Sequence, residues 1–467
     1  MTHSSHPAPS ANRLRIAIVG SGISGLAAAH RLAGEAEVTL FEAGDYFGGH
    51  THTVDVSLPG AAGTVTHGVD TGFLVFNERT YPNLIRLFGE LQVPTALSDM
   101  SFSVQVPDIG LEWSGSSLNS LFAQRRNLVR PAFWRMLADV TRFNRLATAL
   151  AERGVGLGVP AEAAGAQSIG DFLESNRFSA AFRDWYFLPM IGCIWSCPTD
   201  QMLRFPIATM IRFCHNHGLI QITHRPRWFT VRGGARGYVE RLLCGIPDAR
   251  LNTPVRSVRR LREAGQVHIG TDDGTQVFDD VVLACHSDQA LALLGDASPD
   301  ERAVLGAIRY HRNRAVLHTD TAVLPRNPVA WAAWNYERSR GDSREQTSVC
   351  LHYLINRLQP LPFQTPVVVS LNPTTEPRPE TVHGEYDYAH PVFDAAAIAA
   401  QQRVPSLQGQ ANTWFCGAWT RYGFHEDGLM SGMAVTRGWR QRWAPDGVAD
   451  PSGAAPAAAT AETLVSA

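Results

Sequence analysis

The sequence predicts an α/β fold in which a Rossmann-like domain, assembled from discontinuous segments, is interleaved with an α+β substrate domain. Three observations support this prediction. A glycine-rich turn joins an apolar, β-branched strand to a helix near the N-terminus. An acidic residue ends the second strand. Near the C-terminus another apolar strand ends in a glycine and is followed by a loop and a helix with small residues.

Bulk composition narrows the class of protein. The chain has 467 residues and a formal net charge of −2, so no basic excess indicates nucleic-acid binding. Its seven cysteines form no CxxC pair, which indicates reduced thiols in a cytoplasmic protein. No apolar run reaches the roughly 18 residues that a membrane span requires. The polar and low-complexity ends predict a disordered leader over 1–13 and a disordered tail over 444–467.

Between these ends, the pattern of elements predicts two interleaved domains. The cofactor-binding domain is expected over 14–110, 228–298 and 410–443. The substrate domain is expected over 111–227, which is mostly helical in pattern, and over 299–409. In the second of these segments, "RAVLHT", "VCLHYL" and "PVVVSL" predict the strands of a sheet.

The first predicted strand is "LRIAIV" at 14–19, followed by "GSGISG" and the helical run "LAAAHRLAGE". A strand, GxGxxG and a helix in this order are typical of an adenine dinucleotide site. Gly20 permits the tight turn, Gly22 leaves room for a pyrophosphate, and Gly25, next to Ser24, lets the helix pack closely on the strand. The helix N-terminus then offers N–H groups to the phosphates.

The second strand, "EVTLFEA", ends at Glu42, where a carboxylate can accept hydrogen bonds from a ribose diol. The stretch "GGHTHTVDV" follows and places His50 and His52 two residues apart, which on a strand puts both imidazoles on one face. They are either metal ligands or part of a turn shaped for the cofactor. No third and fourth ligand with suitable spacing is nearby, so we predict no metal site.

These segments resemble the fingerprint of the amine oxidase and phytoene desaturase superfamily of FAD enzymes. The resemblance lies in the glycine pair after Glu42, in "GVDTGF", in "RGGARGYVERL" and in "NTWFCGAWTRYGFHEDGLMSG", with a helix expected over 429–437. An arginine usually follows the glycine pair in that superfamily, where this chain has His50, and Asp70 is open to a structural role as well. The resemblance implies FAD as the cofactor, bound by Gly20, Gly22, Ser24, Gly25, Glu42, Gly48, Gly49, His50, Asp70, Gly72, Val255, Gly417, Asp427 and Gly428.

A closer resemblance covers nearly the whole chain between its ends. "SDMSFSV", "LFAQRRNLVRPAFW" and "GFHEDG" are similar to the FAD-dependent oxidoreductase domain at the N-terminus of plant cyclopropane fatty acid synthases, and to its free-standing bacterial counterparts. This resemblance implies an oxidoreductase linked to cyclopropane or other modified fatty acids. The methyltransferase half of those synthases has no counterpart in this sequence, so its activity is not carried over.

Two features of the substrate domain are open to two interpretations each. A helix predicted from Pro131 carries Phe133, Met136 and Phe143 at three- and four-residue steps, so this stripe either contacts the inner face of a membrane or packs in a core. Aromatic residues either wall a cavity for an apolar substrate or form a core: Trp185, Tyr186, Trp195, Trp331, Trp334, Tyr336 and Tyr353.

The chain contains no lysine. Many amine oxidases place a lysine, through a water, on flavin N5, and that arrangement is impossible here. The predicted function is therefore hydride transfer to or from a lipid-like or isoprenoid-like substrate; the alternatives are amine oxidation and a non-catalytic flavin-binding partner of a lipid methyltransferase. The candidates for proton transfer are His425 and Glu426, followed by His215 and His217. Cys416 is a candidate for covalent attachment of FAD.

Overall fold

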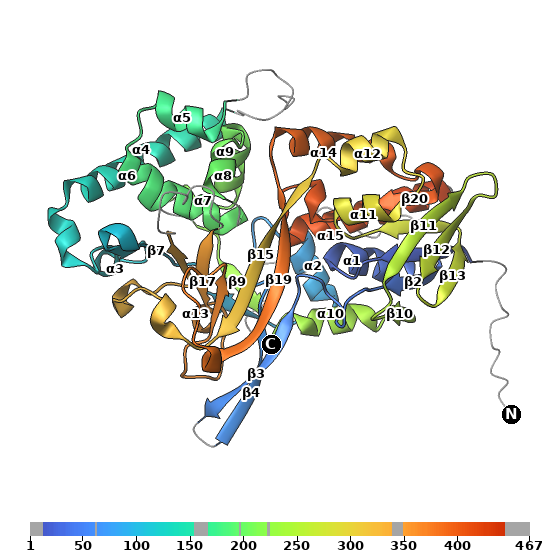
Figure 1. The fold of residues 1–467 in the computed structure, drawn as a ribbon, viewed down its shortest axis with the longest axis horizontal. Helices are drawn as coiled ribbons and strands as arrows, with labels where there is room; N and C mark the ends of the chain where they lie inside the picture. Colours follow the sequence, from blue (N-terminus) through green and yellow to red (C-terminus); the bar gives the residue numbers. More distant parts are fainter. Residues whose placement is uncertain are drawn as a thin grey trace. The chain divides into compact units, whose positions relative to one another are not determined.

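The structure, a computed structural model, describes residues 13–60, 63–153, 167–195, 198–221, 225–338 and 349–443. Apart from Arg13, the predicted leader and tail lie outside these residues. The chain forms two compact units, each assembled from separate segments (Figure 1). Unit 1 contains the described residues within Met1–Thr51, Tyr238–Ala307 and Ala400–Ala458, and unit 2 contains those within His52–Gly237 and Ile308–Ala399.

Unit 1 is built on a five-stranded parallel sheet with the strand order β10-β2-β1-β14-β20. The strands β1, β2 and β14 are buried along nearly their whole length, as apolar runs in parallel sheets usually are. This sheet confirms the predicted Rossmann-like fold. Its strands are β1 Arg15–Val19, β2 Glu37–Phe41, β10 Asp248–Arg250, β14 Asp280–Leu283 and β20 Thr413–Phe415.

An antiparallel meander and the helices complete unit 1. The meander has the order β11-β12-β13, and Asp272-Asp273 form the two-residue loop between β12 and β13, since Thr271 pairs with Gly274. Helices α1 and α15 lie side by side (Figure 1), because a Cβ atom on Gly432 of α15 would stand only 2.3 Å from the carbonyl oxygen of Ser24 in α1. The elements are α1 Ile23–Leu32, α10 Arg236–Leu243, β11 Val255–Leu261, β12 Gln266–Thr271, β13 Gly274–Phe278, α11 Ser287–Leu293, α12 Pro299–Leu305, α14 Ala395–Leu407 and α15 His425–Trp443.

Unit 2 contains a seven-stranded mixed sheet with the order β19-β15-β18-β17-β16-β7-β8, a hairpin of β3 and β4, and a small sheet β5-β9-β6. The strands predicted from "RAVLHT", "VCLHYL" and "PVVVSL" are β15, β17 and β18. The bounds are β3 Thr53–Gly60, β4 Gly63–Asp70, β5 Phe76–Asn77, β6 Thr95–Ser98, β7 Phe102–Val106, β8 Leu111–Ser114, β9 Trp228–Val231, β15 Arg309–His318, β16 Trp334–Glu337, β17 Cys350–Leu354, β18 Val368–Leu371 and β19 Val382–Val392.

The helices of unit 2 decide one of the open interpretations. Phe133, Met136 and Phe143 of α4 are fully buried, so this stripe packs in the core of unit 2 and does not face a membrane. Among the described residues, no helix is both long and apolar enough to cross a bilayer. The helices are α2 Pro82–Glu90, α3 Leu118–Leu121, η2 Arg125–Val129, α4 Pro131–Glu152, α5 Ile169–Ser175, α6 Ala180–Phe182, the π-helix η3 Arg183–Phe187, α7 Leu188–Trp195, α8 Thr199–Leu203, α9 Ile207–Asn216 and α13 Ile355–Leu358.

The two units do not follow the predicted domain boundaries everywhere. Residues 52–110 and 228–237 were expected with the cofactor-binding domain, whereas their contacts group them with unit 2. The division into functional domains stays a prediction.

Candidate cofactor-binding site

The glycine turn after β1 has the geometry that close backbone approach requires. Gly20 has a φ of +102°, a region that favours glycine. A Cβ atom on Gly25 would stand 1.9 Å from the carbonyl oxygen of Gly20, so only glycine allows α1 to start this close to the strand. A Cβ atom on Gly22 would meet nothing within 4 Å, so the backbone is bare and accessible there. The turn and the N-terminus of α1 therefore fit a pyrophosphate.

Glu42 is held in place by the same turn. Its Oε2 accepts hydrogen bonds from the Ser21 backbone N–H at 2.9 Å and from the Ser21 hydroxyl, and its Oε1 accepts one from the Gly44 N–H at 2.8 Å. Sequence reasoning missed Ser21, which stands at a variable position of GxGxxG and carries no signal of its own. A carboxylate fixed in this way at the end of β2 fits the ribose of an adenine dinucleotide.

The pair Gly48-Gly49 lies directly against the glycine turn. Gly48 donates its N–H to the Ser21 hydroxyl at 3.1 Å and pairs with Gly22 in a parallel bridge. A Cβ atom on Gly49 would stand 3.2 Å from the Cα atom of Gly22. The structure therefore brings the two glycine motifs together, and Ser21 is the residue that joins both of them to Glu42.

The two histidines of "GGHTHTVDV" do not share a strand face, because β3 begins only at Thr53. The ring of His50 faces His286 in unit 1, with the ring centroids 6.2 Å apart. His52 belongs to unit 2, where its Nδ1 contacts the Tyr388 hydroxyl at 3.1 Å. The two imidazoles contact different groups, and the role of His50 at the cofactor stays a prediction.

Residues 250–255 pack against the end of β2. The Glu42 N–H donates to the Arg250 carbonyl at 2.9 Å, and the Thr253 N–H donates to the Glu42 carbonyl at 2.8 Å. Val255 follows as the first residue of β11. These bonds bring Val255, which the superfamily resemblance places near the adenine, to the part of unit 1 that holds Glu42.

The C-terminal helix begins earlier than the sequence predicted. It starts at His425 instead of residue 429, and the Gly428 N–H is part of the helix because it donates to the Phe424 carbonyl at 3.0 Å. Asp427 accepts a hydrogen bond from the Phe424 N–H at 3.0 Å, and burial raises its pKa to about 6. The N-terminal end of α15 is thus formed by residues 425–427, and Gly432 packs on α1 as described above.

His425, which is partly buried, ends a chain of three polar groups in unit 1, whose other two members, Tyr238 and Thr51, are buried. Its Nε2 lies 2.7 Å from the Tyr238 hydroxyl, which lies 2.6 Å from the Thr51 hydroxyl. Burial lowers the pKa of His425 to about 3, so the ring is neutral at physiological pH. Glu426, the second candidate for proton transfer, is buried in the first turn of α15. Tyr238 and Thr51 carry no recognisable motif and were not predicted.

Cys416 and Gly417 connect β20 to α15. The Gly417 N–H donates to the Ser431 hydroxyl at 2.9 Å, so this backbone segment is fixed by the helix. The thiol of Cys416 is fully buried, and burial raises its pKa to about 12. The protonated thiol is a poor nucleophile, which argues against a thioether to the cofactor.

Asp70 is an internal anchor of unit 2. Its carboxylate accepts hydrogen bonds from the Thr53 hydroxyl, from the Ala235 N–H at 2.9 Å and from the Gln359 amide at 2.6 Å. Burial raises the pKa of Asp70 to about 7. The acid therefore joins β4 to the 233–235 turn and to Gln359, and its predicted contact with the cofactor, like that of Gly72, stays a prediction.

His215 and His217 lie at the C-terminal end of α9 in unit 2. The ring of His217 stacks on Phe213 at 3.9 Å between centroids, and its Nδ1 lies 3.0 Å from the Phe213 carbonyl. Burial lowers the pKa of His217 to about 4, so this ring is an uncharged packing residue.

Comparison with known proteins agrees with this geometry. Residues 23–316 match the family described as flavin containing amine oxidoreductase. The carotenoid phi-ring synthase of Streptomyces griseus is 30% identical over 303 residues, which are 61% of this chain and 54% of that protein. The chain thus matches about half the length of this curated relative.

Solved structures share the fold. The fatty acid isomerase from P. acnes that produces CLA has a TM-score of 0.60 at 19% identity and covers 91% of this chain and 98% of its own. Cyclohexylamine oxidase from Brevibacterium oxydans has a TM-score of 0.63 at 14% identity, with 92% and 99% covered. At these identities the likeness establishes the fold alone.

The parallel sheet, the paired glycine motifs and the ordered Glu42 fit the cofactor of this family, which is FAD. The chain belongs to the flavin-containing amine oxidoreductase family and is an FAD-dependent oxidoreductase.

Proposed function

We propose that this enzyme transfers a hydride to or from a lipid-like or isoprenoid-like substrate that it takes from a membrane surface. Two relatives have names that refer to such molecules, a carotenoid ring synthase and a fatty acid isomerase. The lack of lysine in the sequence supports the same choice over amine oxidation, because the lysine that many amine oxidases use at the flavin has no counterpart. The link to cyclopropane fatty acid synthesis, which the sequence resemblance implies, is part of this proposal.

FAD, when bound, supplies the two-electron redox chemistry. We propose that the turn of Gly20, Gly22 and Gly25 holds its pyrophosphate and that Glu42 holds its ribose. The other predicted contacts of the cofactor in unit 1 are Ser24, Gly48, Gly49, His50, Val255, Gly417, Asp427 and Gly428.

His425 is better suited to hydrogen bonding than to moving a proton. A general base works best with a pKa near the working pH, and burial holds the pKa of His425 at about 3. The hydroxyl of Tyr238 also occupies its Nε2. We therefore propose that His425 orients the start of α15 as a neutral ring, which leaves Glu426 and His215 as the remaining candidates for proton transfer.

The membrane part of the proposal rests on one exposed apolar surface of unit 2. Eight large apolar side chains are exposed among the described residues. Six of them belong to α3, η2, the start of α4 and the short helices η1 Pro107–Ile109 and η5 Pro328–Ala330. Hydrogen bonds connect these elements, since Arg126 donates to the Gly110 carbonyl and Asn327 to the Ala123 carbonyl. We name this the Trp134 surface; its apolar members are Ile109, Leu118, Leu128, Val129, Trp134 and Val329.

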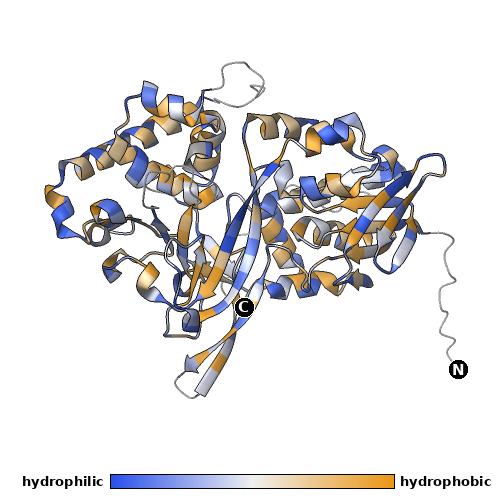
Figure 2. Cartoon of the chain, in the orientation of Figure 1, coloured by the Kyte–Doolittle hydropathy of each residue, from blue (hydrophilic) through white to orange (hydrophobic). Residues whose placement is uncertain are grey.

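Charge identifies the kind of surface that this patch fits. Arg125, Arg126, Arg130 and Arg135 occur in the same stretch of chain as most of these apolar residues, and no acidic residue occurs between Glu112 and Asp139, while Asp108 beside Ile109 pairs with Arg338. Figure 2 shows hydrophilic and hydrophobic segments mixed along these helices. Each arginine near an anionic bilayer contributes about 1 kcal/mol; Arg135 is paired with Asp139, so the other three contribute roughly 3 kcal/mol. Apolar side chains surrounded by basic ones are typical of segments that bind the interface of anionic membranes. We propose an anionic phospholipid surface as the partner.

Anaerobic stopped-flow spectroscopy of the flavin tests the substrate class. We expect vesicle-borne fatty acyl lipids or isoprenoids to bleach the oxidised flavin if they give up the hydride, or to restore the absorption of dithionite-reduced flavin if they accept it, and we expect polyamines to do neither. Bleaching by polyamines alone would instead establish an amine oxidase. A flavin that responds to neither class would favour the non-catalytic partner of a lipid methyltransferase.

Vesicle flotation tests the membrane surface. The double variant Val129→Ser/Trp134→Ser should lose binding to vesicles that contain phosphatidylglycerol, since two of the most exposed apolar side chains are removed. The matched control is Leu97→Ser, which removes an exposed leucine of β6 outside this surface. Equal binding by the double variant and the control would contradict the proposal.

A further inference from the structure

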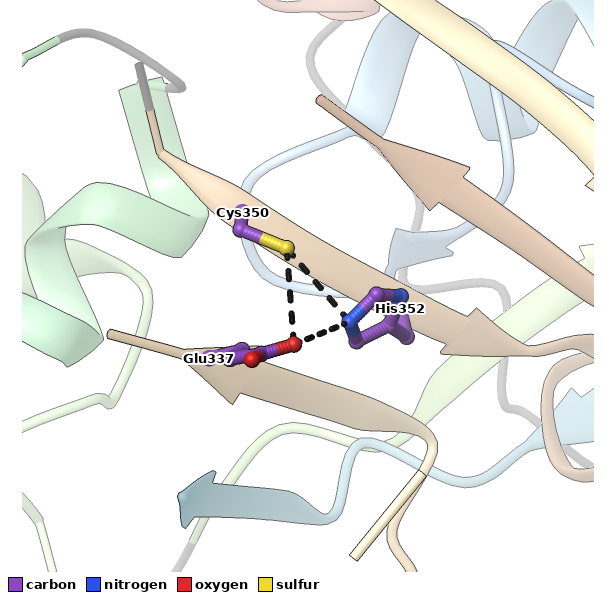
Figure 3. A group of neighbouring side chains, drawn as sticks. All are labelled: Glu337, Cys350 and His352. Carbon is purple, nitrogen blue, oxygen red and sulfur yellow. Dashed lines mark hydrogen bonds and ion pairs between the residues drawn. The ribbon is translucent and has the colours of Figure 1, made fainter. Parts of the chain in front are cut away.

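A second group of chemically competent side chains lies in unit 2, and the proposed function does not use it. Glu337 ends β16, while Cys350 and His352 lie on β17 (Figure 3). All three residues are buried. The Nε2 of His352 lies 3.2 Å from Glu337 Oε2 and 3.4 Å from Cys350 Sγ, and the Sγ and Oε2 atoms are 4.0 Å apart.

The sheet register explains why these side chains meet. Glu337 pairs with Cys350 across the antiparallel strands, and His352 is two residues further along β17, on the same face. The sequence offered no signal for this group, because Glu337 precedes Cys350 by 13 residues and no CxxC or HxxxH spacing occurs. Only the pairing of the two strands brings the three donors together.

The distances fit three ligands of one tetrahedral metal ion. With metal bonds of about 2.0 to 2.3 Å to oxygen, nitrogen and sulfur, tetrahedral ligand atoms stand roughly 3.3 to 3.6 Å apart. Two of the observed distances, 3.2 and 3.4 Å, already lie at this spacing, and the third, 4.0 Å, needs a movement of less than half an ångström. An imidazole, a thiolate and a carboxylate together are a donor set typical of zinc.

Hydrogen bonds on the Nδ1 side of the ring orient His352. Its Nδ1 lies 2.7 Å from the Ser370 hydroxyl, which lies 2.7 Å from His318 Nε2. The Asp320 N–H donates to His318 Nδ1, so the neutral His318 carries its proton on Nε2 and donates to Ser370. The second lone pair of that hydroxyl can accept the Nδ1–H of His352. Nε2 of His352, whose proton forms the ion pair with Glu337 in this structure, can then give up that proton and direct its lone pair at an ion held by Glu337 and Cys350, as a metal-ligating histidine does.

Charge balance also fits a divalent ion. Glu337 is a buried carboxylate whose ion pair in this structure is with His352. A divalent cation bound by a carboxylate, a thiolate and a neutral imidazole gives a group with no net charge, which is the form that burial favours.

We propose that Glu337, Cys350 and His352 bind one zinc ion that ties β16 to β17, with water as the fourth ligand. On binding, the thiol of Cys350 and the protonated ring of His352 each lose one proton to solvent, and no electrons are transferred. This inference does not depend on the identity of the redox substrate.

Metal analysis and cobalt spectroscopy of the purified flavoprotein test the site. We expect about one zinc ion per chain, and Co²⁺ substitution should give d–d bands at wavelengths beyond the flavin absorption. The variant Cys350→Ala should abolish both signals, and the isosteric Glu337→Gln should weaken Co²⁺ binding roughly tenfold while flavin content stays unchanged. The control is Cys244→Ala, which removes an exposed thiol.

Two results would overturn the proposal. One is a folded, reduced flavoprotein that takes up neither zinc nor cobalt at the protein concentration used. The other is metal uptake that survives unchanged in both Cys350→Ala and Glu337→Gln, because the ion would then occupy a different place.

Discussion

Asp70 makes the stability of this protein depend on pH in a direction that can be calculated. Burial raises the pKa of Asp70 from 3.8 to about 7. The folded protein therefore holds this proton more tightly than the unfolded chain, so the stabilising contribution is complete below about pH 4 and is lost as the pH rises to 7. One pKa unit corresponds to about 1.4 kcal/mol, so the loss amounts to roughly 4 kcal/mol, of which about 2 kcal/mol falls between pH 5.5 and 7.

The variant Asp70→Asn removes this dependence. Its amide oxygen can still accept from Thr53 and Ala235, but its NH2 group faces the NH2 group of Gln359, which cannot turn over without losing the bond that its Oε1 accepts from the backbone N–H of residue 70. The lost bond costs roughly 1 to 3 kcal/mol at every pH. Urea unfolding followed by tryptophan fluorescence at pH 5.5, 6.2, 7 and 8 measures the effect. The exposed Asp387→Asn in the same unit is the control. An Asp70→Asn curve that falls with pH as steeply as that of the control would refute the reasoning.

Three further predictions concern unit 1. Gly22→Ala should fold normally but bind FAD weakly, because its Cβ occupies the open space that the turn leaves for the pyrophosphate. Gly25→Ala should unfold, because its Cβ meets the Gly20 carbonyl. The ratio of flavin to protein absorption and the melting temperature distinguish the two. Cys416 should resist iodoacetamide at pH 8, because its buried thiol stays protonated. Acid precipitation should release all FAD from the wild-type protein; flavin that stays on the precipitated chain would indicate a thioether. Tyr238→Phe should lower the rate of flavin reduction without moving its pH profile between 5 and 8, since His425 stays neutral there; a shifted profile would restore His425 as the proton-transfer group.

Much of the fold could be predicted because it depends on short stretches of chain. The run "LRIAIV", the glycine turn and the helix after it form β1 and α1, and the strand lies within one residue of its expected bounds. The C-terminal helix was the weaker prediction. Its polar first turn, His425 to Asp427, looked like a loop, but Asp427 bonds the Phe424 N–H and starts the helix early.

By itself, the sequence determined the parallel sheet, the glycine turn and the acid after β2, because backbone sterics and periodic burial act over a few residues at a time. The tertiary structure decided which side chains meet. It placed Ser21 within hydrogen-bond distance of both Glu42 and Gly48. It brought Gln359 to Asp70, which is 289 positions away, and it paired Glu337 with Cys350 across two strands. Such contacts depend on strand register and on the packing of distant segments, and neither leaves a local pattern in the chain.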